Sequence, residues 1–308
     1  MARCLIIGAN GFLGSHLVDE LDRRGHEVTA FDRFSTATPT YTSQSVTRIA
    51  GDFLNRADVF VAVQNQDYVF HFLSTTTPAS AEDDPTLDVR TNIASSIDLL
   101  SMCVEAGISR VYFASTGGAI YGDQPGVVLD ENAIPQPVSP YAIGKLAIEG
   151  YLRYFERKYA LASVVFRISN PYGPRQHVGK MQGVIPIFLN NIRHGLPVTQ
   201  FGDGSMVRDY LYVQDAIQMM ADAVEAGATQ GLYNIGSGVG TSVSDVLDAV
   251  RKVTGVDPEI AVVSIPPTFV ASSVLAVDRF RSEFGPQNVL SLDQGVERTW
   301  DAIRSGGA

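Results

Sequence analysis

The chain has 308 residues, of which 45% are hydrophobic and 18% are charged, and its formal net charge is −10. This composition excludes a disordered chain, and the length suits one large domain plus a smaller lobe. The negative charge argues against nucleic-acid and membrane-surface partners, because phosphate backbones and anionic lipids would repel it.

Cysteine usage and the N-terminus indicate the compartment. Cys4 and Cys103 show neither a disulfide framework nor metal-ligand spacing, which fits a reducing environment. The apolar run at residues 4–7 is too short for a signal peptide, and no stretch approaches the length of a membrane span. We therefore expect a cytoplasmic protein without a metal.

Strand-like apolar runs alternate with amphipathic helical stretches through the first half of the chain. The pattern predicts strands at residues 4–7, 28–31, 68–72, 111–114 and 163–168, and helices at 13–23, 91–106 and 141–159. Such alternation is typical of βαβ units and a parallel sheet. The strands are nearly continuously apolar, which indicates helices on both faces of the sheet.

After about residue 170 the pattern becomes less regular. Glycine and proline crowd between residues 171 and 186, which favours loops over a further regular unit. Further strands are expected at 209–213 and 232–235, helices at 215–226 and 243–253, and an irregular stretch at 268–277. We expect one domain at 1–170, to which 207–240 returns, and a smaller C-terminal α/β lobe formed by 171–206 and 241–308.

A glycine-rich turn follows the first strand and opens the first helix. Gly8 allows the tight turn, Gly11 lets the backbone approach a pyrophosphate, and Gly14 lets the helix pack on the strand. The motif also brings Phe12 and Leu13 to the helix N-terminus. In this position the motif predicts a dinucleotide site in a Rossmann-type doubly wound sheet.

Acidic residues at strand ends indicate which dinucleotide is bound. Asp32 ends the second strand, where a carboxylate can bind ribose hydroxyls and would repel a 2′-phosphate. This favours NAD over NADP, although the neighbouring Arg33 points the other way. Asp52 and Phe53 follow the third strand-like region. They fit either the adenine side of the site or an ordinary strand-end turn.

Tyr141 and Lys145 carry the chemistry that the sequence predicts. Ser139 and Pro140 are typical of a helix start, so Tyr141 lies in the first helical turn and Lys145 on the same face. A nearby ammonium and the helix N-terminus favour a phenolate, which can act as a base on a hydroxyl group. A tyrosine and a lysine at this spacing also occur by chance on amphipathic helices.

A second polar segment supports the catalytic interpretation. Ser115 and Thr116 end the strand at 111–114, where open α/β sheets bind ligands, and either hydroxyl could hold a reacting oxygen. The alternative is a turn-capping pair before glycines. The glycine turn, the hydroxyl pair and the Tyr/Lys pair, in this order, together predict an NAD-dependent oxidoreduction step.

With these motifs the chain resembles the extended short-chain dehydrogenases of the NAD-dependent epimerase/dehydratase family, UDP-glucose 4-epimerases in particular. The resemblance implies cofactor contacts from Leu73, Ser74 and Asn92. It implies contacts with a nucleotide-sugar substrate, most often UDP-linked, from Thr76, Asn170, Arg175, Val184 and the phosphate-binding Arg208. A homodimer that uses the helices at 91–106 and 141–159 is also implied.

The resemblance further implies a mechanism. Tyr141 deprotonates the sugar 4-hydroxyl while C4 is oxidised by NAD⁺, Thr116 or Ser115 steadies the oxygen, and Lys145 binds the nicotinamide ribose and lowers the pKa of Tyr141. The resulting 4-keto sugar is either reduced on its other face, which is epimerisation, or loses water, which is dehydration. Epimerisation is the favoured outcome.

Three features depart from the resembling family. Its 4,6-dehydratases carry a Thr-Asp-Glu run where this chain has Gly117 and Gly118, which disfavours 4,6-dehydration. No basic residue lies between 253 and 278, where epimerases place a second diphosphate-binding arginine. Leu275 stands where some epimerases have a bulky aromatic residue, so an N-acetyl group, as in UDP-GlcNAc, could fit. A hexosamine 5,6-dehydratase, a simple reductase and a non-catalytic NAD sensor are the alternatives.

Overall fold

The computed structural model describes the chain except for residues 36–37, 125–126, 177–182, 267 and 306–308. The chain forms two compact units. Unit 1 comprises Met1–Thr116, Ser139–Arg167 and Met220–Tyr233, and unit 2 comprises Gly117–Val138, Ile168–Met219 and Asn234–Ala308. In the part of the chain that is described, no helix combines the length and the apolar character that crossing a membrane requires.

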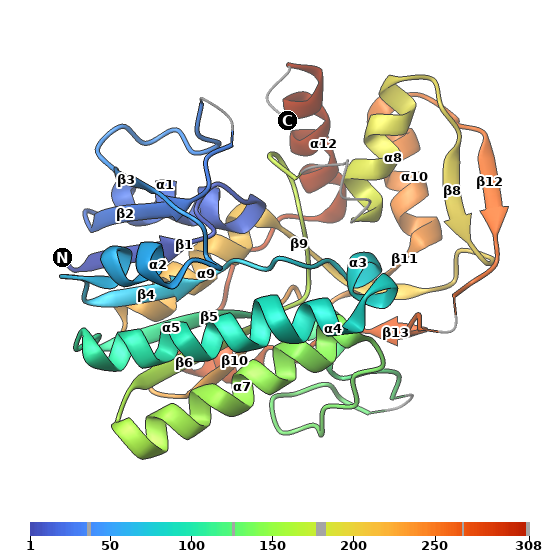
Figure 1. Cartoon of the computed structure of the whole chain (residues 1–308). Coiled ribbons are helices and arrows are strands. Elements are labelled where there is room, and N and C mark those ends of the chain that lie inside the picture. Colours follow the sequence, from blue (N-terminus) through green and yellow to red (C-terminus); the bar gives the residue numbers. More distant parts are fainter. Residues whose placement is uncertain (36–37, 125–126, 177–182, 267, 306–308) are drawn as a thin grey trace. The chain divides into compact units, whose positions relative to one another are not determined.

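Unit 1 is built on a seven-stranded sheet with the order β10-β6-β5-β4-β1-β2-β3 (Figure 1). The strands are β1 (Arg3–Ile7), β2 (Glu27–Asp32), β3 (Thr47–Ala50), β4 (Tyr68–His71), β5 (Arg110–Thr116), β6 (Ala162–Ile168) and β10 (Leu232–Ile235). Strand β1 pairs in parallel with β2 on one side and with β4 on the other. The strand order therefore reverses at β1, which is where doubly wound sheets bind their ligands. The predicted Rossmann-type α/β fold is confirmed.

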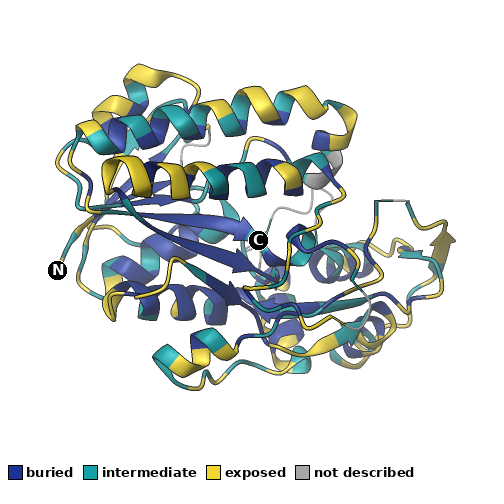
Figure 2. Ribbon diagram, turned by 90° about the horizontal axis from the view of Figure 1, so that it is seen from below, coloured by how far each residue is buried: buried dark blue, intermediate teal, exposed yellow. Residues whose placement is uncertain are grey.

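Helices cover this sheet because each buries one apolar stripe against it. They are α1 (Phe12–Arg23), α2 (Arg56–Val63), α5 (Ala94–Glu105), α7 (Pro140–Tyr159) and α9 (Val213–Glu225), the last continuing from unit 2. Two short helices, α3 (Pro78–Asp83) and α4 (Pro85–Asp88), contact α7. Helices α5 and α7 pack on each other and run side by side in Figure 1. Leu5 of β1, Phe113 of β5 and Ile148 of α7 belong to one buried cluster, and Figure 2 shows the strands as the most buried part.

Two local features set the start of the helices that carry functional side chains. Helix α7 begins as predicted, because the Ser139 hydroxyl accepts a hydrogen bond from the Ala142 N–H and Pro140 occupies the first helical position. The single helix expected at 91–106 is wrong at its start. A π-helical turn, η1 (Val89–Ile93), separates α4 from α5. Such turns occur often at functional sites, because the extra residue changes which side chains face inward.

Unit 2 contains a small mixed sheet, a two-stranded sheet and a group of helices. Its strands are β7 (Asn170–Tyr172), β8 (Val198–Phe201), β9 (Val207–Tyr212), β11 (Gly240–Ser242), β12 (Ile260–Val263) and β13 (Ser272–Ser273). Strand β9 pairs antiparallel with β11 and parallel with β7 and β13. The helices are α6 (Gly117–Ile120), α8 (Val184–Arg193), α10 (Val243–Thr254), α11 (Asp278–Phe284) and α12 (Leu292–Arg304). Helices α8, α10 and α12 pack around Phe188, Val246 and Val296.

Candidate active site

The glycine turn after β1 forms a close-packed cradle. Gly8 has a φ of +89°, and a Cβ built on it would lie 2.8 Å from the Leu73 backbone nitrogen. A Cβ on Gly14 would lie 2.0 Å from the Gly8 carbonyl oxygen. No side chain caps α1 at Gly11, so the N–H groups of its first turn, where Phe12 and Leu13 lie, are available to hydrogen-bond a ligand. This cradle fits the pyrophosphate of a dinucleotide.

Asp32 lies beside this cradle at the end of β2. Its Oδ2 accepts a hydrogen bond of 3.0 Å from the Asn10 N–H, and its Oδ1 accepts one of 2.8 Å from the N–H of Arg33. The carboxylate is thus oriented by the backbone of the glycine turn and by its own strand end. This arrangement fits the ribose hydroxyls of NAD, whereas a 2′-phosphate would meet a like charge.

Asp52 and Phe53 have structural partners after β3. The Asp52 carboxylate accepts a hydrogen bond from the Leu54 N–H, and its own N–H donates to Asp58. Phe53 is buried, with its ring centre 5.2 Å from that of His71. These contacts form a well-packed strand-end turn, and the contact with adenine stays a prediction.

Tyr141 and Lys145 lie one turn apart at the start of α7. The Lys145 side chain is buried, and its Nζ donates a hydrogen bond of 2.9 Å to the carbonyl oxygen of Ala114 near the end of β5. The same Nζ lies 5.8 Å from the centre of the Tyr141 ring. Strand β5 therefore fixes the ammonium group, which in turn lies close to the phenol.

Burial and nearby charges shift the pKa values of both Tyr141 and Lys145. Burial raises the pKa of Tyr141 to about 12, and the negative charge of Asp88 adds to the effect. Burial lowers the pKa of Lys145 to about 8, although Asp88 and Glu149 oppose this change. In the protein without a ligand, burial and then Asp88 thus set the pKa of Tyr141. The expectation that Lys145 lowers this pKa stays a prediction.

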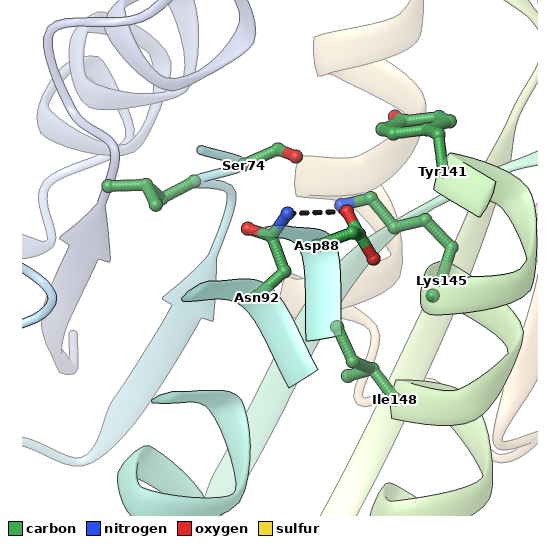
Figure 3. A pocket seen from close by; sticks show the side chains of 8 residues that line it. Ser74, Asp88, Asn92, Tyr141, Lys145 and Ile148 are labelled. Atoms are coloured by element: carbon green, nitrogen blue, oxygen red, sulfur yellow. Dashed lines mark hydrogen bonds between the residues drawn. The ribbon is translucent and has the colours of Figure 1, made fainter. Parts of the chain in front are cut away.

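The loop after β4 and the π-helical turn complete a small pocket beside this pair (Figure 3). The pocket is lined by Leu73, Ser74, Asp88, Asn92, Tyr141, Gly144, Lys145 and Ile148. The Asn92 amide oxygen accepts hydrogen bonds from the N–H and the hydroxyl of Thr75, and its amide nitrogen donates to Thr76 and Asp88. Asn92 thus shapes the loop that contains Ser74 and Thr76. Direct contacts of these residues with cofactor or substrate stay predictions.

The two hydroxyls at the end of β5 differ in their surroundings. The Ser115 hydroxyl is buried and donates a 2.6 Å hydrogen bond to Oε1 of Glu149. Glu149 also accepts hydrogen bonds from the Arg167 guanidinium, at 3.1 Å and 2.7 Å. Side chains alternate along a strand, so the half-buried Thr116 points to the opposite side from Ser115. Thr116 is therefore the better candidate for contact with a substrate oxygen.

In unit 2, Asn170 lies over the glycines that follow β5. Its amide nitrogen donates a 3.3 Å hydrogen bond to the carbonyl oxygen of Asp209, and a Cβ built on Gly118 would lie 3.1 Å from that amide. A side chain at position 118 would therefore require the Asn170 amide to shift by a few tenths of an ångström.

Arg208, the predicted phosphate clamp, has several partners within unit 2. Its guanidinium donates hydrogen bonds to the carbonyl oxygens of Val207, Val270 and Ala271. Arg208 therefore joins β9 to the segment before β13, and its contact with phosphate stays a prediction.

The remaining predicted substrate-side residues also lie in unit 2. Val184 is the first residue of α8, and Arg175 has a left-handed φ of +66°. Leu275 is buried, and its backbone pairs with that of Leu129. Contacts of these residues with a substrate stay predictions.

Sequence reasoning missed Asp88, Gly144, Glu149 and Arg167. One signal was present in the sequence, because Glu149 lies four residues after Lys145 and therefore shares its helix face. Asp88 lies four residues before Asn92, but the π-helical turn between them could not be read from the residue pattern.

Comparisons with known proteins agree with this geometry. The profile of the NAD dependent epimerase/dehydratase family matches residues 4–236. UDP-glucose 4-epimerase of Mycolicibacterium smegmatis is 31% identical over 98% of this chain and 99% of its own length. The solved structure of Thermus thermophilus UDP-glucose 4-epimerase with NAD is 34% identical, with a TM-score of 0.91 over 98% of this chain and 99% of its own. UDP-N-acetylglucosamine 4-epimerase of Methanobrevibacter ruminantium, solved with UDP-N-acetylmuramic acid, is 26% identical, with a TM-score of 0.90 over 99% of both chains.

Proposed function

We propose that this chain, which belongs to the NAD-dependent epimerase/dehydratase family, is a 4-epimerase that acts on a UDP-hexose or a UDP-N-acetylhexosamine. Its membership of the family makes it an NAD-dependent enzyme of the isomerase or lyase type. The observation that carries the proposal is the pairing of Tyr141 and Lys145 beside the carboxyl ends of β4 and β5, in a sheet whose first turn fits a dinucleotide.

The chain's own residues have distinct roles in this proposal. Asp32 and the glycine turn hold NAD, which supplies a reversible hydride acceptor when it is bound. Tyr141 accepts the proton of the sugar 4-hydroxyl and later returns it to the same oxygen. The Thr116 hydroxyl donates a hydrogen bond to that oxygen. Lys145, fixed by the Ala114 carbonyl, holds a positive charge near the phenol as it becomes an anion.

Two observations support epimerisation over elimination. Elimination needs an acid and a base on the sugar, and unit 2 has glycines at positions 117 and 118, with the Asn170 amide over Gly118. Three of the similar proteins and structures described above are 4-epimerases, two of UDP-glucose and one of UDP-N-acetylglucosamine. Both sugars are therefore candidate substrates.

Proton NMR in deuterated water, with the NAD-loaded protein and each UDP-sugar in turn, tests the proposal. We expect inversion at C4 with no deuterium in the sugar, because the hydrogen on C4 stays with the enzyme and returns to C4. New alkene signals, or deuterium at C5 or C6 with loss of water, would make the protein a dehydratase and refute the epimerase proposal.

A pair of tyrosine variants on α7 controls the experiment. Tyr141→Phe removes only the phenol oxygen, and we expect a loss of turnover of at least about a thousandfold with retained NAD. Tyr151→Phe changes a tyrosine on the same helix that is 38% exposed, and should turn over as the wild type does. Equal activity of both variants would contradict the role of Tyr141. Release of NADH after a single reduction would identify a reductase instead.

A further inference from the structure

A buried carboxylate lines the same pocket as Tyr141 and Lys145. Asp88 is 3% exposed, and its Oδ1 accepts hydrogen bonds from the Thr76 hydroxyl at 2.5 Å and from the Asn92 amide at 2.7 Å. The Asn92 amide also donates to the Thr76 hydroxyl at 2.8 Å. The three side chains form a closed ring of hydrogen bonds, which holds the carboxylate in one orientation.

Helix α7 is shaped to receive this carboxylate. A Cβ built on Gly144 would lie 1.8 Å from Oδ2 of Asp88. Only glycine at position 144 lets the carboxylate contact the backbone of α7, and this contact lies between Tyr141 and Lys145 along the helix. Figure 3 shows Asp88, Tyr141 and Lys145 around the same pocket. The π-helical turn that follows Asp88 directs Asn92 inward, although Val89 on the same turn is exposed.

The charged and titratable groups around this pair come from α7, β6, β4 and α4. On α7 itself, Glu149 lies one turn beyond Lys145, and its charge is balanced by Arg167 of β6. His71 of β4 is buried, and its burial, together with Lys145, lowers its pKa to about 3, so it is neutral at ordinary pH. Unlike Glu149, Asp88 has no arginine or lysine partner among the ion pairs of the described residues, so its negative charge is not balanced within an ion pair.

We propose that Asp88 is a positioning residue for catalysis, which Thr76, Asn92 and Gly144 hold against α7 so that its negative charge acts on both Lys145 and Tyr141 and couples the two groups. Both effects agree with the directions found for the two groups, because Asp88 raises the pKa of Tyr141 and that of Lys145. The role of Tyr141 as base rests on the proposed function, whereas the coupling of the three charges does not require a substrate.

Titration of Tyr141 in the NAD-loaded protein tests this inference directly. The ultraviolet absorbance of tyrosinate is followed against pH in the wild type and in Tyr141→Phe, and the difference between the curves belongs to Tyr141. The same pair is then measured in the Asp88→Asn background, which keeps size and hydrogen-bonding capacity but removes the charge. We expect the midpoint to move to lower pH by about one unit or more.

Asp83→Asn is the matched control, because it removes an exposed carboxylate from the same segment. Its Tyr141 midpoint should remain at the wild-type pH. An unchanged midpoint in Asp88→Asn, or an equal shift in Asp83→Asn, would overturn the inference. Loss of turnover with every nucleotide sugar would instead refute the proposed function and would leave this titration readable.

A second pair of variants tests the contact even where Asp88→Asn does not fold. Gly144→Ala places a methyl group against the carboxylate, so we expect a clear fall in melting temperature. In the Asp88→Ala background the space is open, and the same substitution should cost much less. Equal losses in both backgrounds would show that the carboxylate does not rest on Gly144, and would also overturn the inference.

Discussion

Removal of the Glu149 side chain should destabilise unit 1 more than removal of any partner of an exposed ion pair. Its side chain is 1% exposed and that of Arg167 is 3% exposed. Glu149→Ala breaks two hydrogen bonds to Arg167 and one to Ser115, and it removes the carboxylate that pairs with the buried guanidinium. Loss of one partner of a buried pair costs about 3–5 kcal/mol. For a chain of 308 residues this corresponds to a fall in melting temperature of roughly 5–8 °C.

The assay is differential scanning calorimetry of three variants. Asp257→Ala removes an ion pair with Arg251 in which the aspartate is 80% exposed, and it should cost at most about 1 kcal/mol. The double variant Glu149→Leu/Arg167→Leu should lose less stability than Glu149→Ala, because no charge is left unpaired. A fall for Glu149→Ala no larger than that for Asp257→Ala would refute the reasoning.

Three further predictions follow from particular contacts. Gly14→Ala should weaken NAD binding at least about tenfold in a fluorescence titration, because its Cβ would lie 2.0 Å from a carbonyl oxygen of the cofactor turn, whereas Gly150→Ala on α7 should bind normally. Thr116→Val should lower kcat by roughly ten- to a hundredfold with little change in melting temperature, and Ser115→Ala should mainly lower the melting temperature. Burial lowers the pKa of His71 from 6.5 in the unfolded chain to about 3 in the folded protein. Between these values only the unfolded state binds the proton, so the free energy of unfolding should fall as pH drops through this range. His71→Phe should flatten the fall, as denaturant titrations at several pH values would show.

The sequence predicted the parts of unit 1 that depend on local pattern. The continuous apolar runs of β1, β4 and β5 are buried on both faces, and this pattern alone indicates a parallel sheet. The Ser-Pro start of α7 fixed where Tyr141 lies, because the cap and the proline act within one turn. In contrast, β3 is mostly exposed and gave no apolar run, so its bounds could not be predicted.

Contacts between distant segments could not be predicted in the same way. The pKa of Tyr141 depends on a carboxylate 53 positions earlier in the chain, and no local pattern reveals that proximity. Ser115 and Thr116 were equivalent in the sequence, and the structure distinguishes them by their burial and by the hydrogen bond from Ser115 to Glu149. The phosphate role of Arg208 came from the family resemblance alone, and its carbonyl partners at 270 and 271 belong to a distant segment that no local pattern reveals.

One face of α7 links the two networks described above. Tyr141, Lys145 and Glu149 follow at intervals of four residues, so they lie in a row on the helix. Arg167 of β6 holds Glu149, and the backbone of β5 holds Lys145, so the helix is joined to the sheet at two points. The Asp88 carboxylate rests on the same helix at Gly144. Tyr141, the proposed proton acceptor, therefore lies at the end of a row that is joined to the sheet at Lys145 and Glu149, with the charge of Asp88 beside it.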